Sequence, residues 1–366
     1  MNQIKHLFKR DKAVVEAAGT PEVAKTVDFT RGPLKIKQAR FNLPIWAKAW
    51  ISLIPAMIFL LAFMIYPIIN TTIISFMENF AWQRGAGSFA FSNFFQQLEN
   101  SLNPDLLTPV TAPKISLKNY ISVFTDRDFQ NSVVNTVILV LVSVPLTIGI
   151  SLVLAVLLNS IKKLQGLYQT IFFLPYVTNS IALGMVFNVM FSASDGGLMN
   201  QFLSIFGLDP RAWIYAAQGA TKFTMGVAIT VSTVWNGLAF KILVFMSGLA
   251  SIDKQYYDAA RIDGTPRGRI FAKITVPLLS PQILYITITS FIGAFKAYSG
   301  IIAIFGQGAT NYGGGAGKAW MTIVGYIYNF RDLKLPYAAA GSVILLLLIL
   351  LITLVQFQVS KRRVHY

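Results

Sequence analysis

The chain has 366 residues, of which 54% are hydrophobic and 13% are charged. Soluble domains usually carry about 25% charged residues, so this composition excludes an ordinary soluble protein and indicates a polytopic membrane protein. The chain contains no cysteine, which excludes disulfides, thiol nucleophiles and cysteine-based metal sites, and its two histidines are His6 and His365, near the ends.

Six stretches are apolar enough to cross a hydrocarbon core of about 30 Å, which takes about 20 residues of helix. We expect spans at Ala47–Ile69, Val133–Leu158, Tyr168–Phe191, Phe223–Leu249, Gln282–Phe305 and Ala338–Phe357, and none of them contains Asp or Glu. The predicted fold is therefore all-α, a polytopic membrane protein with about six transmembrane helices.

These spans predict the division of the chain. We expect a cytoplasmic N-terminal tail at 1–45, a first transmembrane helix at 46–77, an extracytoplasmic loop at 78–130, a five-helix transmembrane core at 131–360 and a cytoplasmic tail at 361–366. The core contains a charged loop at 250–281.

The basic residues predict the orientation of the chain. With the N-terminus in the cytoplasm, the inner segments hold more than twice as many Lys and Arg as the outer segments. Cytoplasmic loops of membrane proteins collect such residues, so we expect both termini to be cytoplasmic. The net charge of +16 is then explained by topology in the bilayer, and no nucleic-acid partner is expected.

A glycine-rich outer segment, "NYGGGAGKAW", does not match a nucleotide-binding loop. A P-loop reads G-x-x-x-x-G-K-[ST], but Tyr312 stands where the first Gly is needed and Ala319 where the hydroxyl is needed. We therefore expect this segment to bind no nucleotide. Because the chain also lacks cysteine and has only two histidines, both near its ends, we expect no cofactor-binding site, no metal site and no catalytic activity in it.

Ion-driven carriers usually keep carboxylates in mid-membrane, and the six spans contain none. The full charges in the spans are Lys241 and Lys296, each of which either has a structural role or contacts a translocated solute. The candidates for the solute path are Lys241, Lys296, Asn236, Tyr298 and Asn188.

The charged loop contains the stretch "YYDAARIDGTPRGRIFAKITVP", Tyr256 to Pro277. Ser251 or Asp253, just before this stretch, can cap a helix that continues into it. Gly264 tolerates a positive φ that ends a helix, and Pro266 suits the first turn of the next one. The residues predict a helix, a sharp turn and a second helix at the inner membrane surface.

The first of these helices carries small residues on one face. Tyr256, Ala259, Ala260 and Asp263 can share that face, and the two alanines allow another surface to approach closely. The residues alone leave two interpretations open, a solvated loop and a docking element.

The spacing D-A-A-x-x-x-G, nine residues, I-x-V-P, from Asp258 to Pro277, resembles the E-A-A-x-x-x-G-x(9)-I-x-L-P loop of permeases of binding-protein-dependent ABC importers. Asp258 replaces the usual Glu and Val276 the usual Leu. Further pieces resemble the carbohydrate subgroup, which includes maltose-type and glycerol-3-phosphate-type permeases. They are "SLKNYISVF", Phe129, Asn135–Thr136, "FFLPYV", "GLMNQFL", "YIYNF" and "YAAAGSVIL".

The resemblance implies that the charged loop is a coupling helix docked on a cytoplasmic ABC ATPase dimer, which hydrolyses the ATP. The residues implied in this coupling are Tyr256, Asp258, Ala259, Ala260, Arg261, Asp263, Gly264 and Pro277.

The resemblance also implies a second homologous permease subunit, an extracytoplasmic solute-binding protein and a location in the cell membrane. The implied solute is a sugar or oligosaccharide. Two alternatives stay open: an importer of a glycerol-3-phosphate-type solute and an ATP-independent pore or facilitator.

Overall fold

A computed structural model of the chain describes residues 44–78, 80, 114–161, 163, 165–194, 196–215, 218–305, 319–331 and 334–360. Most of the predicted N-terminal tail, the middle of the predicted 78–130 loop, most of the glycine-rich segment and the C-terminal tail lie outside these residues.

The first compact unit of the chain ends at Met64. Its described part is helix α2, Ile45–Leu60, followed by the π-helical turn η2, Leu61–Ile65. No residue of α2 is buried, although nearly all of its side chains are apolar. A helix that is apolar on every side requires lipid or other helices around it. This agrees with the prediction of a first membrane span in this stretch.

The second unit begins with helix α3, Tyr66–Ser75. A short antiparallel pair follows, in which β1, Met77–Glu78, pairs with β2, Lys114–Ile115. Helix α5, Lys118–Thr125, comes next. The amide of Asn119 donates to the carbonyls of Ser75 and Met77 at 3.0 and 3.1 Å, which fastens α5 to the end of α3.

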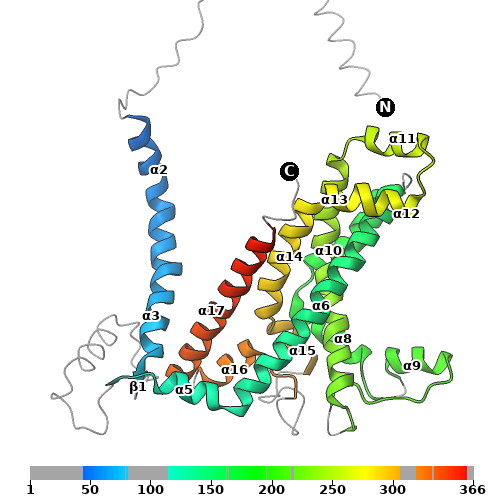
Figure 1. Ribbon diagram of the computed structural model, residues 1–366. Coiled ribbons are helices and arrows are strands. Elements are labelled where there is room, and N and C mark those ends of the chain that lie inside the picture. The colour runs from blue at the N-terminus through cyan, green and yellow to red at the C-terminus, as the bar shows by residue number, and fades with distance from the viewer. Residues whose placement is uncertain are drawn as a thin grey trace, which may run out of the picture. The chain divides into compact units, whose positions relative to one another are not determined.

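Three long helices form the frame of this unit (Figure 1). They are α6, Arg127–Ser160, α10, Lys222–Ser251, and α17, Leu335–Ser360. The Asp126 carboxylate caps α6 by accepting from the Asp128 amide, and Thr221 caps α10. Each of the three is long and apolar enough to cross a membrane.

Two of the predicted spans are divided. The stretch predicted at Tyr168–Phe191 consists of α7, Gln165–Val177, and α8, Ser180–Met190, and the side chain of Asn179 caps α8. The stretch predicted at Gln282–Phe305 consists of α14, Ser280–Phe295, and α15, Ser299–Phe305. Each of these two predicted stretches therefore consists of two helices rather than one.

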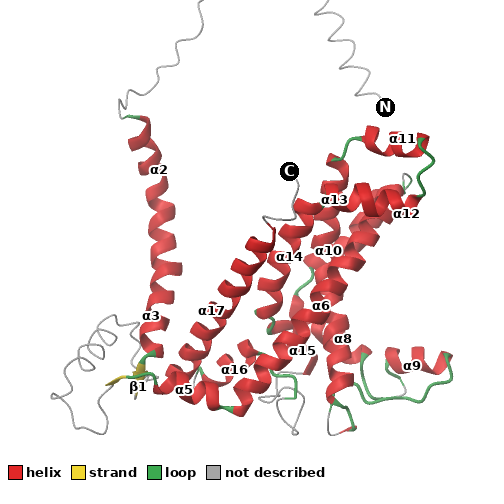
Figure 2. Ribbon diagram, in the orientation of Figure 1, coloured by secondary structure: helices red, strands yellow, loops and turns green. Residues whose placement is uncertain are grey.

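The short helices lie at the two ends of the bundle (Figure 2). At one end are α11, Lys254–Ile262, α12, Arg267–Ile270, the π-helical turn η5, Phe271–Thr275, and α13, Val276–Leu278. At the other end are α9, Leu198–Ile205, and α16, Ile323–Phe330.

The predicted all-α, multi-span fold is confirmed. Among the described residues, four helices are long and apolar enough to span a membrane, or five when a helix pair bent by 69° is counted as one span. The expected count of six stays a prediction.

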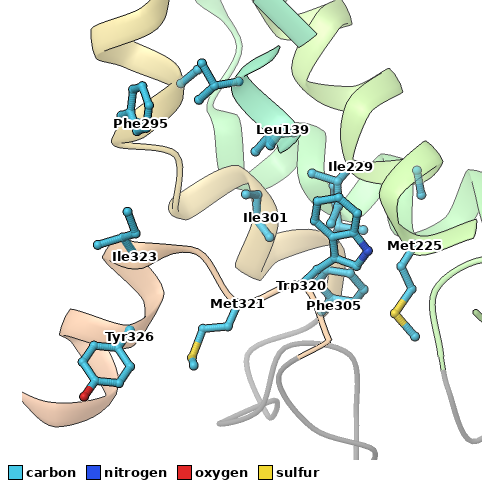
Figure 3. Close-up of a cluster of buried hydrophobic side chains, with 14 of the residues drawn as sticks. Leu139, Met225, Ile229, Phe295, Ile301, Phe305, Trp320, Met321, Ile323 and Tyr326 are labelled. Atoms are coloured by element: carbon cyan, nitrogen blue, oxygen red, sulfur yellow. The ribbon is translucent and has the colours of Figure 1, made fainter. Parts of the chain in front are cut away.

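The described residues contain three clusters of buried hydrophobic side chains, a small one around Ile74, Met77 and Ala339 and two larger ones. The largest one joins α6, α8, α10, α15, α16 and α17, and Figure 3 shows Phe305, Trp320 and Met321 gathered with Ile229 and Ile301. The second, which includes Leu158, Phe245 and Leu279, joins α6, α10 and α14 toward the α11–α12 end. Between them the two larger clusters hold the divided stretches against α6 and α10.

Candidate functional site

The loop between α10 and α14 folds as a helix, a turn and a second helix. Asp253 caps α11, with its Oδ1 accepting from the Gln255 amide at 3.0 Å. Gly264 ends α11 with φ +66°, where its amide donates to Arg261 O and the Thr265 amide donates to Ala260 O. These two bonds form a Schellman turn, which needs a residue in the left-handed region. The predicted helical pair and positive φ are confirmed.

An open cavity of about 570 Å³ lies between α11 and the segment that follows it. Its lining includes Tyr256, Ala259, Ala260 and Asp263, the four residues predicted to share a face. Ala259 is exposed, whereas Ala260 is only 7% exposed because the chain itself covers it. Of the two alanines, Ala259 is therefore the one that a partner can approach directly, and Ala260 packs within the loop.

The remaining predicted loop residues lie apart from this cavity. Asp258 and Arg261 form an exposed ion pair of 3.2 Å along α11, and Pro277 lies in α13. The sequence reasoning passed over Ile262, which is 87% exposed at the end of α11. A large apolar side chain in that position was the signal available in the sequence.

The loop is connected firmly to the bundle. The hydroxyls of Tyr257 in α11 and Thr275 in η5 lie 3.3 Å apart in a hydrogen bond. Leu279 is fully buried at the 69° bend between the Arg267–Leu278 helices and α14. The hydrogen bond and the buried Leu279 thus attach α11 to the segment that leads into α14.

A cavity of about 380 Å³ lies where the two divided stretches meet α10. Three of the predicted path residues, Lys296, Asn236 and Tyr298, line it. Lys296 and Tyr298 lie in the break between α14 and α15, where the backbone leaves the helix. The break thus brings a cation and a phenol to one wall of a cavity whose opposite wall is α10.

A second cavity, of about 300 Å³, adjoins the first, because Thr233, Gly293 and Ala297 line both. Lys241 lines this second cavity, and its Nζ donates to the carbonyl of Gly237 at 3.1 Å. The two lysines of the predicted spans therefore lie on neighbouring cavities.

Asn188 lies on neither cavity. Its amide donates to the hydroxyl of Tyr215 at 2.7 Å and to the carbonyl of Ile304. These bonds join α8 to α15 and to the loop before α10, so the structure gives Asn188 a fastening role.

Several cavity residues were missed by the sequence reasoning. Tyr176, Thr178 and Ser180 line the first cavity from the α7–α8 break, and Ser299 lines it from the α14–α15 break. The available signal was the cluster of polar residues Thr178, Asn179 and Ser180 inside an apolar stretch.

An aromatic stack extends from the first cavity. The rings of Tyr298 and Tyr328 stack with centroids 4.1 Å apart, and the guanidinium of Arg331 lies 4.9 Å from the centroid of the Tyr328 ring. Tyr298 therefore connects the cavity lining to α16 at the end of the bundle opposite α11.

Comparison with known proteins gives a family match over residues 147–365, to the binding-protein-dependent transport system inner membrane component. A lactose transport system permease protein of Rhizobium radiobacter is 29% identical over 86% of this chain and 94% of its own. An arabinooligosaccharides permease protein of Halalkalibacterium halodurans is 32% identical over 67% and 75%. A sn-glycerol-3-phosphate permease protein of Agrobacterium fabrum is 32% identical over 69% and 82%.

The fold also matches solved structures. A bacterial ABC transporter involved in the import of the acidic polysaccharide alginate contains a chain that aligns with a TM-score of 0.67 at 20% identity, over 87% of this chain and 96% of that one. At this identity the likeness describes the fold alone.

Proposed function

Because the chain belongs to the family of binding-protein-dependent transport system inner membrane components, we propose that it forms the translocation path of an ATP-driven importer for a sugar or oligosaccharide. Members of this family are transport subunits, so the chain is not an enzyme. It lies in the cell membrane with partners on both sides.

The α11–Gly264–α12 loop carries this proposal. The loop lies between α10 and α14, and it presents an open cavity, the exposed Ala259 and Ile262, which is 87% exposed. Exposed apolar groups beside a concave surface are typical of a protein interface. The loop is the coupling helix, and it docks on a separate cytoplasmic ATPase dimer.

The orientation of the chain follows from this docking. The loop and both termini face the cytoplasm, and α16 faces the extracytoplasmic solute-binding protein. A second homologous permease completes the membrane part, so that the solute passes between two such chains.

The solute path runs along the two adjoining cavities. Their walls combine Asn236, Thr233 and Ser299 with the rings of Tyr176 and Tyr298. Hydroxyl and amide groups beside aromatic rings suit a sugar, because they pair with its hydroxyls while a ring packs on its apolar face. The names of the three relatives, two of which specify saccharides, support the same solute class.

The test is to purify the tagged chain from its own membrane and to reconstitute the complex with its binding protein. We expect an ATPase and a second permease in stoichiometric amounts, and uptake of labelled oligosaccharide only with ATP on the loop side. Uptake by this chain alone, without ATP, would assign it instead to the pores and facilitators.

A variant pair tests the docking itself. Ala259→Trp fills the cavity beside the exposed face of α11 and should lower copurification of the ATPase and ATP-driven uptake at least tenfold. Lys254→Trp places the same indole side chain at an exposed residue outside the cavity lining and should have little effect. Equal losses of ATPase copurification and uptake in both variants would mean that Ala259 does not lie in the interface.

A further inference from the structure

Three cations follow one another along the proposed solute path. Arg331 lies against Tyr328, Tyr328 stacks on Tyr298, and Tyr298 shares the first cavity with Lys296. The first cavity adjoins the second, which Lys241 lines. The series runs from α16, at one end of the bundle, to the middle of α10.

The two lysines, Lys296 and Lys241, face no carboxylate among the described residues that line their cavities. The ion pairs found among the described residues join Lys118 to Glu78 and Arg261 to Asp258, and neither involves a cavity lysine. A cation within the membrane is costly and is kept where it meets a partner or a solute.

Both lysines have donors left for a solute. The Lys241 ammonium carries three N–H groups, and one hydrogen bond to Gly237 is found for it. Lys296 is exposed at the helix break, in the wall of the first cavity. A neutral sugar needs no such charge, since the hydroxyl and amide groups of the walls already match its hydroxyls.

We propose that Arg331, Lys296 and Lys241 form a cationic row that selects a saccharide or polyol carrying an anionic group. This inference rests on the proposed function and specifies its substrate class. Lysine and arginine bind carboxylate, sulfate and phosphate oxygens by charge-assisted hydrogen bonds, which are shorter and about twice as strong as neutral ones. The Tyr298–Tyr328 stack offers a ring surface for the sugar between the charged groups.

The first experiment compares solutes on the reconstituted complex with its binding protein. The panel contains neutral oligosaccharides, uronate-containing oligosaccharides, sulfated ones, and sugar and polyol phosphates, and stimulation of ATP hydrolysis is measured. We expect the strongest stimulation of ATP hydrolysis from an anionic solute. Comparison of the uronate, sulfated and phosphorylated solutes then shows whether a carboxylate, a sulfate or a phosphate is preferred. Strongest stimulation by a neutral sugar would overturn the cationic row and leave the importer intact. Stimulation by none would overturn both.

The second experiment assigns the selectivity to the lysines. Lys296→Gln and Lys241→Gln should each raise the KM for uptake of the best anionic solute at least tenfold. Lys296→Arg should retain most of the affinity, and Lys163→Gln, an exposed lysine outside both cavities, should not change it.

A chemical control removes the charge from the solute. When the best anionic group is a carboxylate, it is reduced to the alcohol, and otherwise the sulfate or phosphate ester is hydrolysed. The Lys296→Gln and Lys241→Gln variants should then differ from the wild type less than twofold. An unchanged KM for the anionic solute in both variants would overturn the proposal. If a variant inserts poorly into the membrane, the comparison of solutes on the wild-type complex decides the proposal.

Discussion

The hydroxyl of Tyr326 donates a hydrogen bond of 2.8 Å to Oδ2 of Asp126, which lies 200 positions earlier in the chain. The other oxygen of the same carboxylate caps α6 by accepting from the Asp128 amide at 2.9 Å. The ring of Tyr326 also packs edge-on against Phe129, with centroids 5.2 Å apart. One carboxylate thus joins the start of α6 to α16.

Removing the Tyr326 hydroxyl tests this connection. Tyr326→Phe should lower the free energy of unfolding by about 1.5–3 kcal/mol, because the half-buried, charged carboxylate of Asp126 loses a hydrogen-bond donor. Tyr285→Phe, in an exposed position on α14, should have almost no effect. Thermal unfolding in detergent measures both, and equal stabilities would mean that the bond contributes nothing.

The same bond predicts a pH dependence. Burial, and then the hydrogen bond to Asp126, raise the pKa of Tyr326 above its usual value. A group whose folded pKa is raised contributes stability that is complete below the unfolded pKa of about 10 and is lost as pH rises through the folded value. Wild type and Tyr326→Phe should therefore differ in stability by a constant amount from neutral pH up to about pH 10 and converge only above it.

Close packing of α8 on α15 gives another prediction. A Cβ at Gly184 would lie 3.0 Å from the carbonyl oxygen of Gly300 and against the Cβ of Ala303. Gly184→Ala should therefore destabilise the chain by about 1–3 kcal/mol through overpacking. At Gly149 nothing lies within 4 Å, so Gly149→Ala should be neutral or stabilising. Unfolding curves of equal midpoint would contradict the close approach.

The turn between α11 and α12 can be tested without adding bulk. Gly264→Ala places a Cβ at φ +66°, which costs about 1–2 kcal/mol, and should reduce ATP-driven uptake about 5–30-fold while membrane insertion stays normal. Gly268→Ala, in the helical α12, should leave uptake unchanged. Full uptake by Gly264→Ala would mean that the angle between the two helices does not matter for coupling.

Orientation is measured with single cysteines, since the native chain has none. Lys114→Cys and Lys254→Cys lie at opposite ends of the second unit and both positions are exposed. An impermeant maleimide should label Lys114→Cys in intact cells and Lys254→Cys only after permeabilisation. The reverse pattern would put the α11–α12 loop outside and remove the ATPase docking with it.

Much of the fold was predictable because its signals are local. The apolar lengths indicate a multi-span helical protein, and the Asp253 cap and Gly264 turn fix the α11–α12 pair within a dozen residues. The resemblance of Asn135–Thr136 to a family motif also pointed to positions that matter. The structural role of these two residues was not visible in the sequence, because it consists of long-range hydrogen bonds. The Asn135 amide donates to the carbonyls of Ala319 and Met321, and Thr136 accepts from the Ile323 amide.

By itself, the sequence determined the helical membrane class and the shape of the α11–α12 loop, because helix length, capping and a left-handed glycine depend on neighbours in the chain. Only the tertiary structure decided that Lys296 and Tyr298 meet Asn236 at one cavity and that Asn188 joins α8 to α15. These features depend on contacts between residues far apart in the chain, such as Asn188 with Ile304, 116 positions later, and hydropathy carries no record of them.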